Sequence, residues 1–347
     1  MLIKPQVLKR GDKVATVSSS FGGAGDNDIR WRYDQGVERL EKEFGLKVIP
    51  MPHSLKGSDY LYKHPEKRAE DLMTAFRDPD IKAIISNIGG EESIRLLPYI
   101  DFEVIRKNPK IVTGYSDTTI THLFCWKAGL SSHYGLALLV DLAENVAMDP
   151  YTIDMVERTM FSTRPIGEII PPREWTSEFL EWEIKNKHTS RKMNKNKPYE
   201  LLSGSGVVEG HLLGGCMSVL EFAKGTSIWP AAEDWEGSIL FFETSEDKPT
   251  PEQVTYWLRN YGAQGILKKV NGMIFAKPAD ETYYDEYKKV IKTVLYEFGV
   301  RDLPVLYNVS IGHTEPKVII PYGAKARIDC ENTSLFIDDH AVVNSDG

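Results

Sequence analysis

The chain has 347 residues, with 42 Lys and Arg against 50 Asp and Glu, a formal net charge of −8 and 41% hydrophobic residues. At about 100–200 residues per domain this length predicts two domains, and the composition is that of a globular rather than a disordered protein. The acidic balance argues against polymeric nucleic acid as a partner, because such binding depends on neutralising phosphates, but it allows a small nucleotide-like ligand in a pocket.

The cysteines and the N-terminus indicate the cellular compartment. Cys125, Cys216 and Cys330 lie far apart, which fits a reducing compartment better than a disulfide framework. Lys9 and Arg10 stand where a secretory signal would need apolar residues. No window approaches the roughly 18 apolar residues of a membrane span. We therefore expect a cytoplasmic protein with no membrane partner.

The first half of the chain alternates short apolar runs with amphipathic stretches. Apolar residues between Ile29 and Phe44 recur every three or four positions, as on one helix face. Strands are predicted at 13–17, 46–49, 82–86 and 110–113, and helices at 29–44, from 65 onward, at 91–97 and at 118–128. This alternation predicts an α/β fold with a parallel sheet covered on both faces.

The pattern breaks between about 165 and 203. Trp175, Phe179 and Trp182 are followed by a basic run from Lys185 to Lys197, which is typical of a solvated flexible linker. Beyond it regular structure resumes at 206–210. We then predict a turn at Gly214–Gly215, strands at 237–242, 272–276, 303–307, 318–320 and 326–329, and helices through Leu220, at 251–261 and at 283–298. The predicted units are an N-terminal domain (1–165), a linker with an aromatic and basic loop (166–203) and a C-terminal domain (204–347).

Two glycine-containing turns follow predicted strands and precede helices. In Gly114-Tyr-Ser116-Asp117 the serine has the strand–turn–helix context of a nucleophile elbow, although a helix-capping serine has the same context. Glycines in Ser86-Asn-Ile-Gly89-Gly90 let backbone N–H groups approach a ligand. The N–H groups of Gly90 and Asp117 could therefore form an oxyanion hole. The alternative for the second turn is a plain helix entry.

Glu243 and His313 are the candidate partners of that serine. Glu243 ends an apolar strand and His313 lies on a Gly-flanked loop after another strand, where open α/β folds place their ligands. Glu243 could also be a solvated strand end, and the other seven histidines are interpreted as structural. The order Ser116, Glu243, His313 is that of α/β-hydrolase triads and permits acyl transfer, with His313 as the base.

No cofactor or metal is predicted. The loop Gly23-Ala-Gly25-Asp-Asn-Asp28, which follows three serines, lacks the third glycine of a dinucleotide fingerprint, and the chain has no Gly-Lys-Ser/Thr phosphate loop. It also has no HExxH motif or Cys/His cluster. We interpret the serine and glycine loop as part of an active-site rim.

Taken together, the motifs resemble the LD-carboxypeptidase family of serine peptidases. They are Arg68-Ala-Glu-Asp-Leu72, Ile88-Gly-Gly90, Gly114-Tyr-Ser-Asp117, Gly210-His-Leu-Leu-Gly-Gly215, Phe242-Glu243 and Gly312-His-Thr314. The resemblance implies a flavodoxin- or glutamine-amidotransferase-like N-terminal domain, a smaller α/β C-terminal domain and a homodimer. It also implies a Ser116–Glu243–His313 triad and an oxyanion hole at Gly90 and Asp117.

Within that family the chain is most similar to the microcin C self-immunity branch. The turn Ser86-Asn-Ile-Gly89-Gly90 and the segment from about 172 to 200 carry this likeness. In that branch an aromatic side chain stacks on the nucleobase of a peptidyl-nucleotide, for which the candidates are Trp175, Phe179 and Trp182, unless they pack as a hydrophobic hinge. Cys216 stands where the family usually has Asn, which could alter a contact to substrate.

The resemblance leaves three functions to compare. The first is cleavage of an amide in a peptidyl- or aminoacyl-nucleotide antibiotic, for self-immunity or detoxification. The second is an LD-carboxypeptidase that releases a terminal D-amino acid from murein peptides. The third, a non-catalytic two-domain binder of small molecules, is disfavoured because all three triad residue types are present. Glu91 and Glu92, directly after the paired glycines, could disfavour substrates that carry a carboxylate, unless their side chains point outward.

Overall fold

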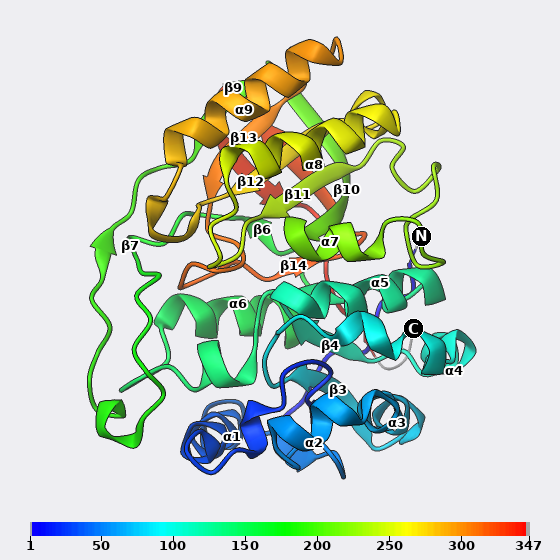
Figure 1. The fold of residues 1–347 in the computed structure, drawn as a ribbon, viewed down its shortest axis with the longest axis vertical. Helices are drawn as coiled ribbons and strands as arrows, with labels where there is room; N and C mark the ends of the chain where they lie inside the picture. The colour runs from blue at the N-terminus through cyan, green and yellow to red at the C-terminus, as the bar shows by residue number, and fades with distance from the viewer. Residues whose placement is uncertain (1, 345–347) are drawn as a thin grey trace.

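The computed structural model describes residues 2–344 and contains two large sheets (Figure 1). The first sheet has the strand order β14-β5-β4-β3-β1-β2, and β1 to β5 run parallel. Its strands are β1 (Lys13–Val17), β2 (Lys47–Pro50), β3 (Ile81–Ser86), β4 (Ile111–Gly114), β5 (His133–Tyr134) and β14 (Ile320–Pro321). The mixed α/β fold with a parallel sheet is therefore confirmed.

Helices connect these strands and pack their apolar faces on the sheet. Helix α1 buries Tyr33, Leu40 and Phe44 and ends at Gly45, whose φ of 66° is left-handed, as is common after a helix. Proline opens α3, where a missing N–H costs no hydrogen bond. The helices are α1 (Arg30–Phe44), α2 (Ser58–Lys63), α3 (Pro65–Arg77), α4 (Phe102–Lys107), α5 (Thr119–Ala128) and α6 (Pro150–Met160).

The second sheet has the order β6-β16-β15-β10-β11-β12-β13-β9, with β10 to β13 parallel at its centre. Helices α8 and α9 lie above it in Figure 1, and α7 lies between the two sheets. The strands are β6 (Gly167–Glu168), β9 (Glu200–Ser203), β10 (Val207–Cys216), β11 (Ile239–Glu243), β12 (Gly272–Ala276), β13 (Val305–Val309), β15 (Lys325–Asp329) and β16 (Ser334–Ile337). The helices are α7 (Met217–Ala223), α8 (Pro251–Ala263) and α9 (Tyr284–Glu297).

One sequence prediction in this region is wrong. Gly214 and Gly215 do not form a turn but lie inside β10, which pairs with β11 as far as Cys216. The glycines are needed for close approach rather than for reversal, because a Cβ on Gly214 would lie 1.8 Å from the Phe241 carbonyl oxygen. At Gly215 φ is 141°, and a Cβ there would meet Thr119 on α5.

The segment predicted as a flexible linker is tied to the second sheet at both of its ends. Its first strand, β6, pairs with β16, and its last strand, β9, pairs with β13. Between them β7 (Glu174–Trp175) and β8 (Asn194–Lys195) form a two-stranded ladder at the left edge of Figure 1. The interpretation of the basic run as simply solvated is wrong for Arg191, whose side chain is 13% exposed and bridges two carboxylates.

No helix within residues 2–344 is both long and apolar enough to cross a membrane.

Candidate functional site

Ser116 lies at a strained turn directly after β4. Its φ of 60° is unusual for a residue with a side chain and is the kind of strain that strand-to-helix nucleophile turns store. Glycine at position 89 makes room for it, since a Cβ there would lie 2.8 Å from the Ser116 Cβ. The Ser116 N–H donates to the Tyr134 hydroxyl at 3.1 Å. Ser116 is the first residue inside the short helical turn that follows, and the N-cap position belongs to Tyr115.

Glu243 is buried at the end of β11 and is not a solvated strand end. Its side chain has an exposed fraction of 0%. The Tyr134 O–H donates to Oε1 at 2.5 Å, and His313 Nδ1 contacts Oε2 at 2.7 Å. The loop fits closely around this carboxylate, because a Cβ on Gly312 would lie 2.3 Å from the carboxyl carbon. The Glu243 carboxylate is therefore placed to orient the imidazole of His313 and to hold a negative charge beside it.

His313 is held between two carboxylates. Besides the Glu243 contact at Nδ1, its Nε2 lies 2.8 Å from Oε2 of Glu246, and its ring meets the Tyr115 ring edge-on at 5.0 Å. Burial by itself would lower the pKa of His313, but the two carboxylates outweigh that effect and raise it above its ordinary value. Each ring nitrogen thus contacts a carboxylate, an arrangement that favours the imidazolium over the free base.

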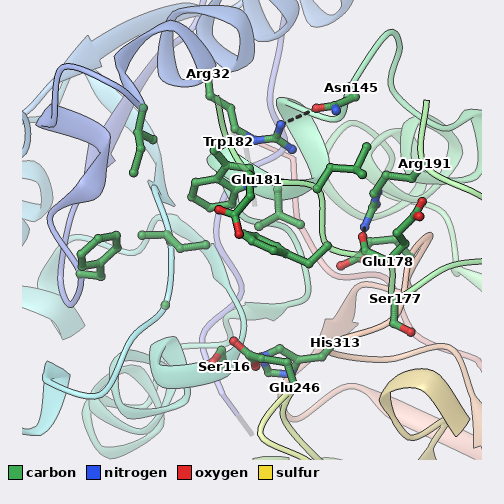
Figure 2. A pocket seen from close by; sticks show the side chains of 18 of the residues that line it. Arg32, Ser116, Asn145, Ser177, Glu178, Glu181, Trp182, Arg191, Glu246 and His313 are labelled. Carbon is green, nitrogen blue, oxygen red and sulfur yellow. Dashed lines mark hydrogen bonds and ion pairs between the residues drawn. The ribbon is translucent and has the colours of Figure 1, made fainter. Parts of the chain in front are cut away.

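Ser116 and His313 line the same cavity, of roughly 530 Å³. In Figure 2 Ser116, His313 and Glu246 lie together at one end of this cavity, and Arg32, Trp182 and Glu181 line the opposite end. The first sheet supplies the serine, and the second supplies the glutamate and histidine. The structure thus brings together the three residues predicted from sequence.

The predicted oxyanion residues sit beside the serine. A Cβ on Gly89 would lie 3.3 Å from the Asp117 nitrogen, and Gly90, at φ 140°, approaches the Ser20 hydroxyl too closely for any side chain. The buried Asp117 carboxylate accepts hydrogen bonds of 2.8 Å from the N–H groups of Glu92 and Ser93. That side chain therefore fastens the glycine turn to the serine turn.

The serine and glycine loop packs on the same turn, as expected for a rim. The Phe21 N–H donates to the Gly89 carbonyl at 3.0 Å, and Phe21 lines the cavity. Glu91 is exposed and lies outside the described cavity wall. The carboxylate of its neighbour Glu92 is paired with Arg68 and Arg95.

The three aromatic candidates of the linker separate into two groups. Trp182 and Phe179 line the cavity, and their rings lie 6.1 Å apart. Behind Trp182 the Arg32 guanidinium stands 5.0 Å from its ring centre. Trp175 is 5% exposed, packs under the Lys277 ammonium at 4.6 Å and lies outside the described cavity wall. Only the first two are placed to meet a ligand in this cavity.

Cys216 lies behind the candidate triad rather than on the cavity wall as described. It pairs with Glu243 across β10 and β11 and is buried, with its N–H donating to Thr119 Oγ1 at 3.2 Å. Burial and the nearby Glu243 charge raise the pKa of its thiol well above the usual value. A neutral thiol therefore packs beside the carboxylate that holds His313.

Several residues around the site were missed by the sequence analysis. Tyr134 lies in a two-residue strand and Glu246 in a polar loop, so neither stands out by pattern. The same is true of a chain of buried charges beside the cavity. It runs from Glu144 through Arg191, Glu315 and Lys317 to Asp141, and the Lys317 ammonium stands 3.7 Å over the Tyr115 ring. The sequence shows these residues only as spaced charges, a pattern that solvated loops share.

Within residues 2–344 no group of three or more His, Cys, Asp or Glu side chains could hold a metal ion.

Comparisons with known proteins place the chain in a family. The model of the LD-carboxypeptidase N-terminal domain matches residues 14–135, and that of the C-terminal domain matches residues 209–328. The chain belongs to the LD-carboxypeptidase family. It is accordingly a hydrolase of the serine carboxypeptidase class, as the resemblance of its motifs implied.

Relatives in this family carry two kinds of name. The microcin C7 self-immunity protein MccF of Escherichia coli is 29% identical over 338 residues, which cover 96% of this chain and 94% of that protein. A Bacillus subtilis protein named "Probable murein peptide carboxypeptidase" is 28% identical over 350 residues, covering 96% of this chain and 94% of that protein.

Solved structures match over almost the whole chain. An MccF-like protein from Streptococcus pneumoniae, in complex with AMP, superposes with a TM-score of 0.87 and 36% identity, covering 95% of this chain and 99% of that one. MccF in complex with aspartyl sulfamoyl adenosine superposes with a TM-score of 0.83 and 27% identity, covering 98% and 100%. The two-domain architecture predicted from the sequence is therefore confirmed.

Proposed function

We propose that this LD-carboxypeptidase family member is a serine amidase that cleaves an amide bond in a peptidyl- or aminoacyl-nucleotide of the microcin C type, for self-immunity or detoxification. The observation that carries the proposal is that Ser116 and a Glu243-bound His313 share one cavity with an aromatic pair, the exposed Phe179 and the half-buried Trp182. The cavity is of a size suited to a nucleotide-sized ligand.

The chemistry follows from the roles these groups can take. Once its Nε2 is free and unprotonated, His313 accepts the Ser116 proton as the serine oxygen bonds to the scissile carbonyl carbon. Glu243 stabilises the imidazolium that forms. The N–H groups of Gly90 and Asp117 bind the oxyanion, with about 3–4 kcal/mol lost when such a donor is removed. His313 then passes the proton to the leaving nitrogen as the C–N bond breaks, and water hydrolyses the acyl-enzyme by the same route.

The nucleotide part of the substrate is assigned to Phe179 and Trp182. Stacking of a base on an aromatic ring contributes about 1–3 kcal/mol and tolerates any base. Trp182 is supported from behind by Arg32, whose guanidinium also donates to the Leu139 carbonyl and to Asn145 Oδ1 at 2.5 Å. The complexes of the MccF-like protein with AMP and of MccF with aspartyl sulfamoyl adenosine support this assignment.

The experiment that tests the proposal follows product release by mass spectrometry. Wild type and Ser116→Ala are each given an aminoacyl-sulfamoyl-adenosine and a murein tetrapeptide that ends in D-Ala. We expect serine-dependent cleavage of the adenosine compound. Cleavage of the tetrapeptide alone would instead support the second candidate, an LD-carboxypeptidase of murein recycling, which the Bacillus subtilis relative's name favours.

The proposal includes a homodimer and a cytoplasmic location. The homodimer follows from the family resemblance, and light scattering on the purified protein tests it. The location is supported by three buried cysteines that are all free thiols, as is usual in a reducing compartment. Cell fractionation tests it.

A further inference from the structure

The ion pair between His313 and Glu246 cannot persist during the proposed reaction. His313 must be neutral with Nε2 free in order to take the serine proton, yet Nε2 is occupied by Glu246 at 2.8 Å. Glu246 stands near the tip of a short turn, closed by a hydrogen bond from the Lys248 N–H to the Ser245 carbonyl, and its side chain is 71% exposed. It is therefore free to rotate away when a ligand enters.

The surrounding wall offers the released carboxylate no other cation. The described wall carries six carboxylates and two guanidinium groups, namely Asp28, Glu178, Glu181, Glu183, Glu246 and Glu315 against Arg32 and Arg191. Both guanidinium groups are already engaged, Arg32 by the Leu139 carbonyl and Asn145 and Arg191 by Glu144 and Glu315. Among the groups that could replace His313 as the partner of Glu246, a positive charge carried by the ligand itself is therefore the one that the wall does not supply.

We propose that Glu246 recognises a primary ammonium group of the substrate beside the scissile carbonyl, and that on binding it exchanges His313 for that group. The inference rests on the proposed function, because an aminoacyl-nucleotide carries a free α-ammonium on the carbon next to the carbonyl that Ser116 attacks. One exchange then does two things. Within the proposed substrate class it favours aminoacyl- over peptidyl-nucleotides, because only the former have a free amine next to the scissile carbonyl. It also frees the catalytic base when such a substrate binds.

The same exchange separates the two candidate substrates. In a murein tetrapeptide the nitrogen on the carbon next to the scissile carbonyl is already an amide, so it has no positive charge to offer Glu246. An acidic wall around the reacting groups also disfavours carboxylate-bearing ligands, since like charges repel in a partly desolvated site.

The test compares alanyl-sulfamoyl-adenosine with its N-acetyl derivative, which differs only in lacking the ammonium charge. We expect wild type to prefer the free amine in kcat/KM by about tenfold or more, as for a charged hydrogen bond in a partly enclosed site. Glu246→Gln should lose this preference. Asp247→Asn removes the same charge one residue later, from an exposed side chain, and should keep it.

A pH profile separates recognition from a merely structural role. The groups that face His313 are Glu243, Glu246, the Tyr115 ring and, beyond that ring, Lys317. Loss of the Glu246 charge should lower the pKa of His313, so the acidic limb of kcat/KM for the N-acetyl substrate should move to lower pH in Glu246→Gln. In Ser116→Ala, NMR titration of His313 should show the same lowering when the free-amine substrate binds, but not with the N-acetyl form.

The outcomes distinguish this inference from the proposed function. If wild type cleaves both nucleotides equally, or if Glu246→Gln slows both by the same factor with an unmoved acidic limb, the inference is overturned and the proposed function stands. If only the tetrapeptide is cleaved, both are overturned. If no substrate is cleaved, the proposed function fails, and the NMR titration still decides whether a free amine displaces Glu246.

Discussion

Arg191 offers the sharpest test of how the linker segment supports the site. Its guanidinium joins Glu144, after the first sheet's last parallel strand, to Glu315, two residues beyond His313. The backbones of Thr176 and Glu315 also exchange two hydrogen bonds of 2.8 Å. Arg191→Ala should therefore loosen the segment from about 172 to 197 and, with it, the loop that carries His313.

The free-energy cost of Arg191→Ala can be estimated from how deeply its ion pairs are buried. The Arg191 side chain is 13% exposed and its partners are 17% and 12% exposed. Breaking a fully buried pair from one side costs about 3–5 kcal/mol. Because Lys317 still pairs with Glu315 at 2.9 Å, we expect about 2–3 kcal/mol, most of it in local opening of the segment rather than in global unfolding. At about 1.4 kcal/mol per factor of ten, the open population should rise roughly 30- to 150-fold.

A glutamate-specific protease measures this opening, since Glu181 and Glu183 are exposed in the segment and the variant adds or removes no glutamate. In Arg191→Ala the rate of cleavage at these two glutamates should rise roughly 30- to 150-fold, and kcat should fall for any substrate. Lys192→Ala removes the neighbouring positive charge, which is exposed, and should behave as wild type. Arg191→Lys should lie between, because an ammonium cannot span two carboxylates as a guanidinium does. A cleavage rate within twofold of wild type in Arg191→Ala would refute the reasoning.

Three further predictions concern the site itself. Ser116→Ala and His313→Ala should each lower kcat by about 10³-fold or more, with far less than additive loss together; near-normal turnover in either would remove the triad assignment. Tyr134→Phe removes the hydroxyl between the Ser116 N–H and the Glu243 carboxylate and should lower kcat about tenfold or more with little change in KM; an effect on KM alone would contradict this role. Trp182→Ala should raise KM about tenfold for a nucleotide substrate but not for a peptide, whereas the buried Trp175 should affect Tm when replaced by Ala, and the opposite pattern would reverse the assignment.

The predictable part of the fold was its regular part. Strands β1 and β12 begin and end where the apolar runs do, and α1 follows its apolar face to within a residue. The two-residue strands β5, β6 and β7 had no such signal, because two residues carry no period. These strands form by pairing with segments far away in the chain. The same holds for Gly214, where close approach of the neighbouring strand β11, and not a local turn, requires glycine.

The site divides in the same way. Ser116, Glu243 and His313 could be singled out from the sequence because each follows a predicted strand or a glycine turn, and the carboxyl ends of parallel strands lie at one edge of a sheet. Residue types could not predict that Glu246 contacts Nε2 of His313, or that Cys216 is buried outside the described cavity wall. Both depend on side-chain directions that are set only once the two sheets are packed together.

The route of the chain explains how residues from two sheets keep a common geometry. The segment carrying His313 leaves β13 in the second sheet and enters β14, which pairs with β5 in the first sheet. Tyr134, on β5, donates to Glu243 on β11 and so joins the same two sheets a second time. A shift between the sheets would therefore change the Tyr134–Glu243 contact and the approach of His313 to Ser116 together. Because catalysis is sensitive to misplacement of about 1 Å, substitutions packed between β5 and β11 should lower kcat even where they touch no substrate.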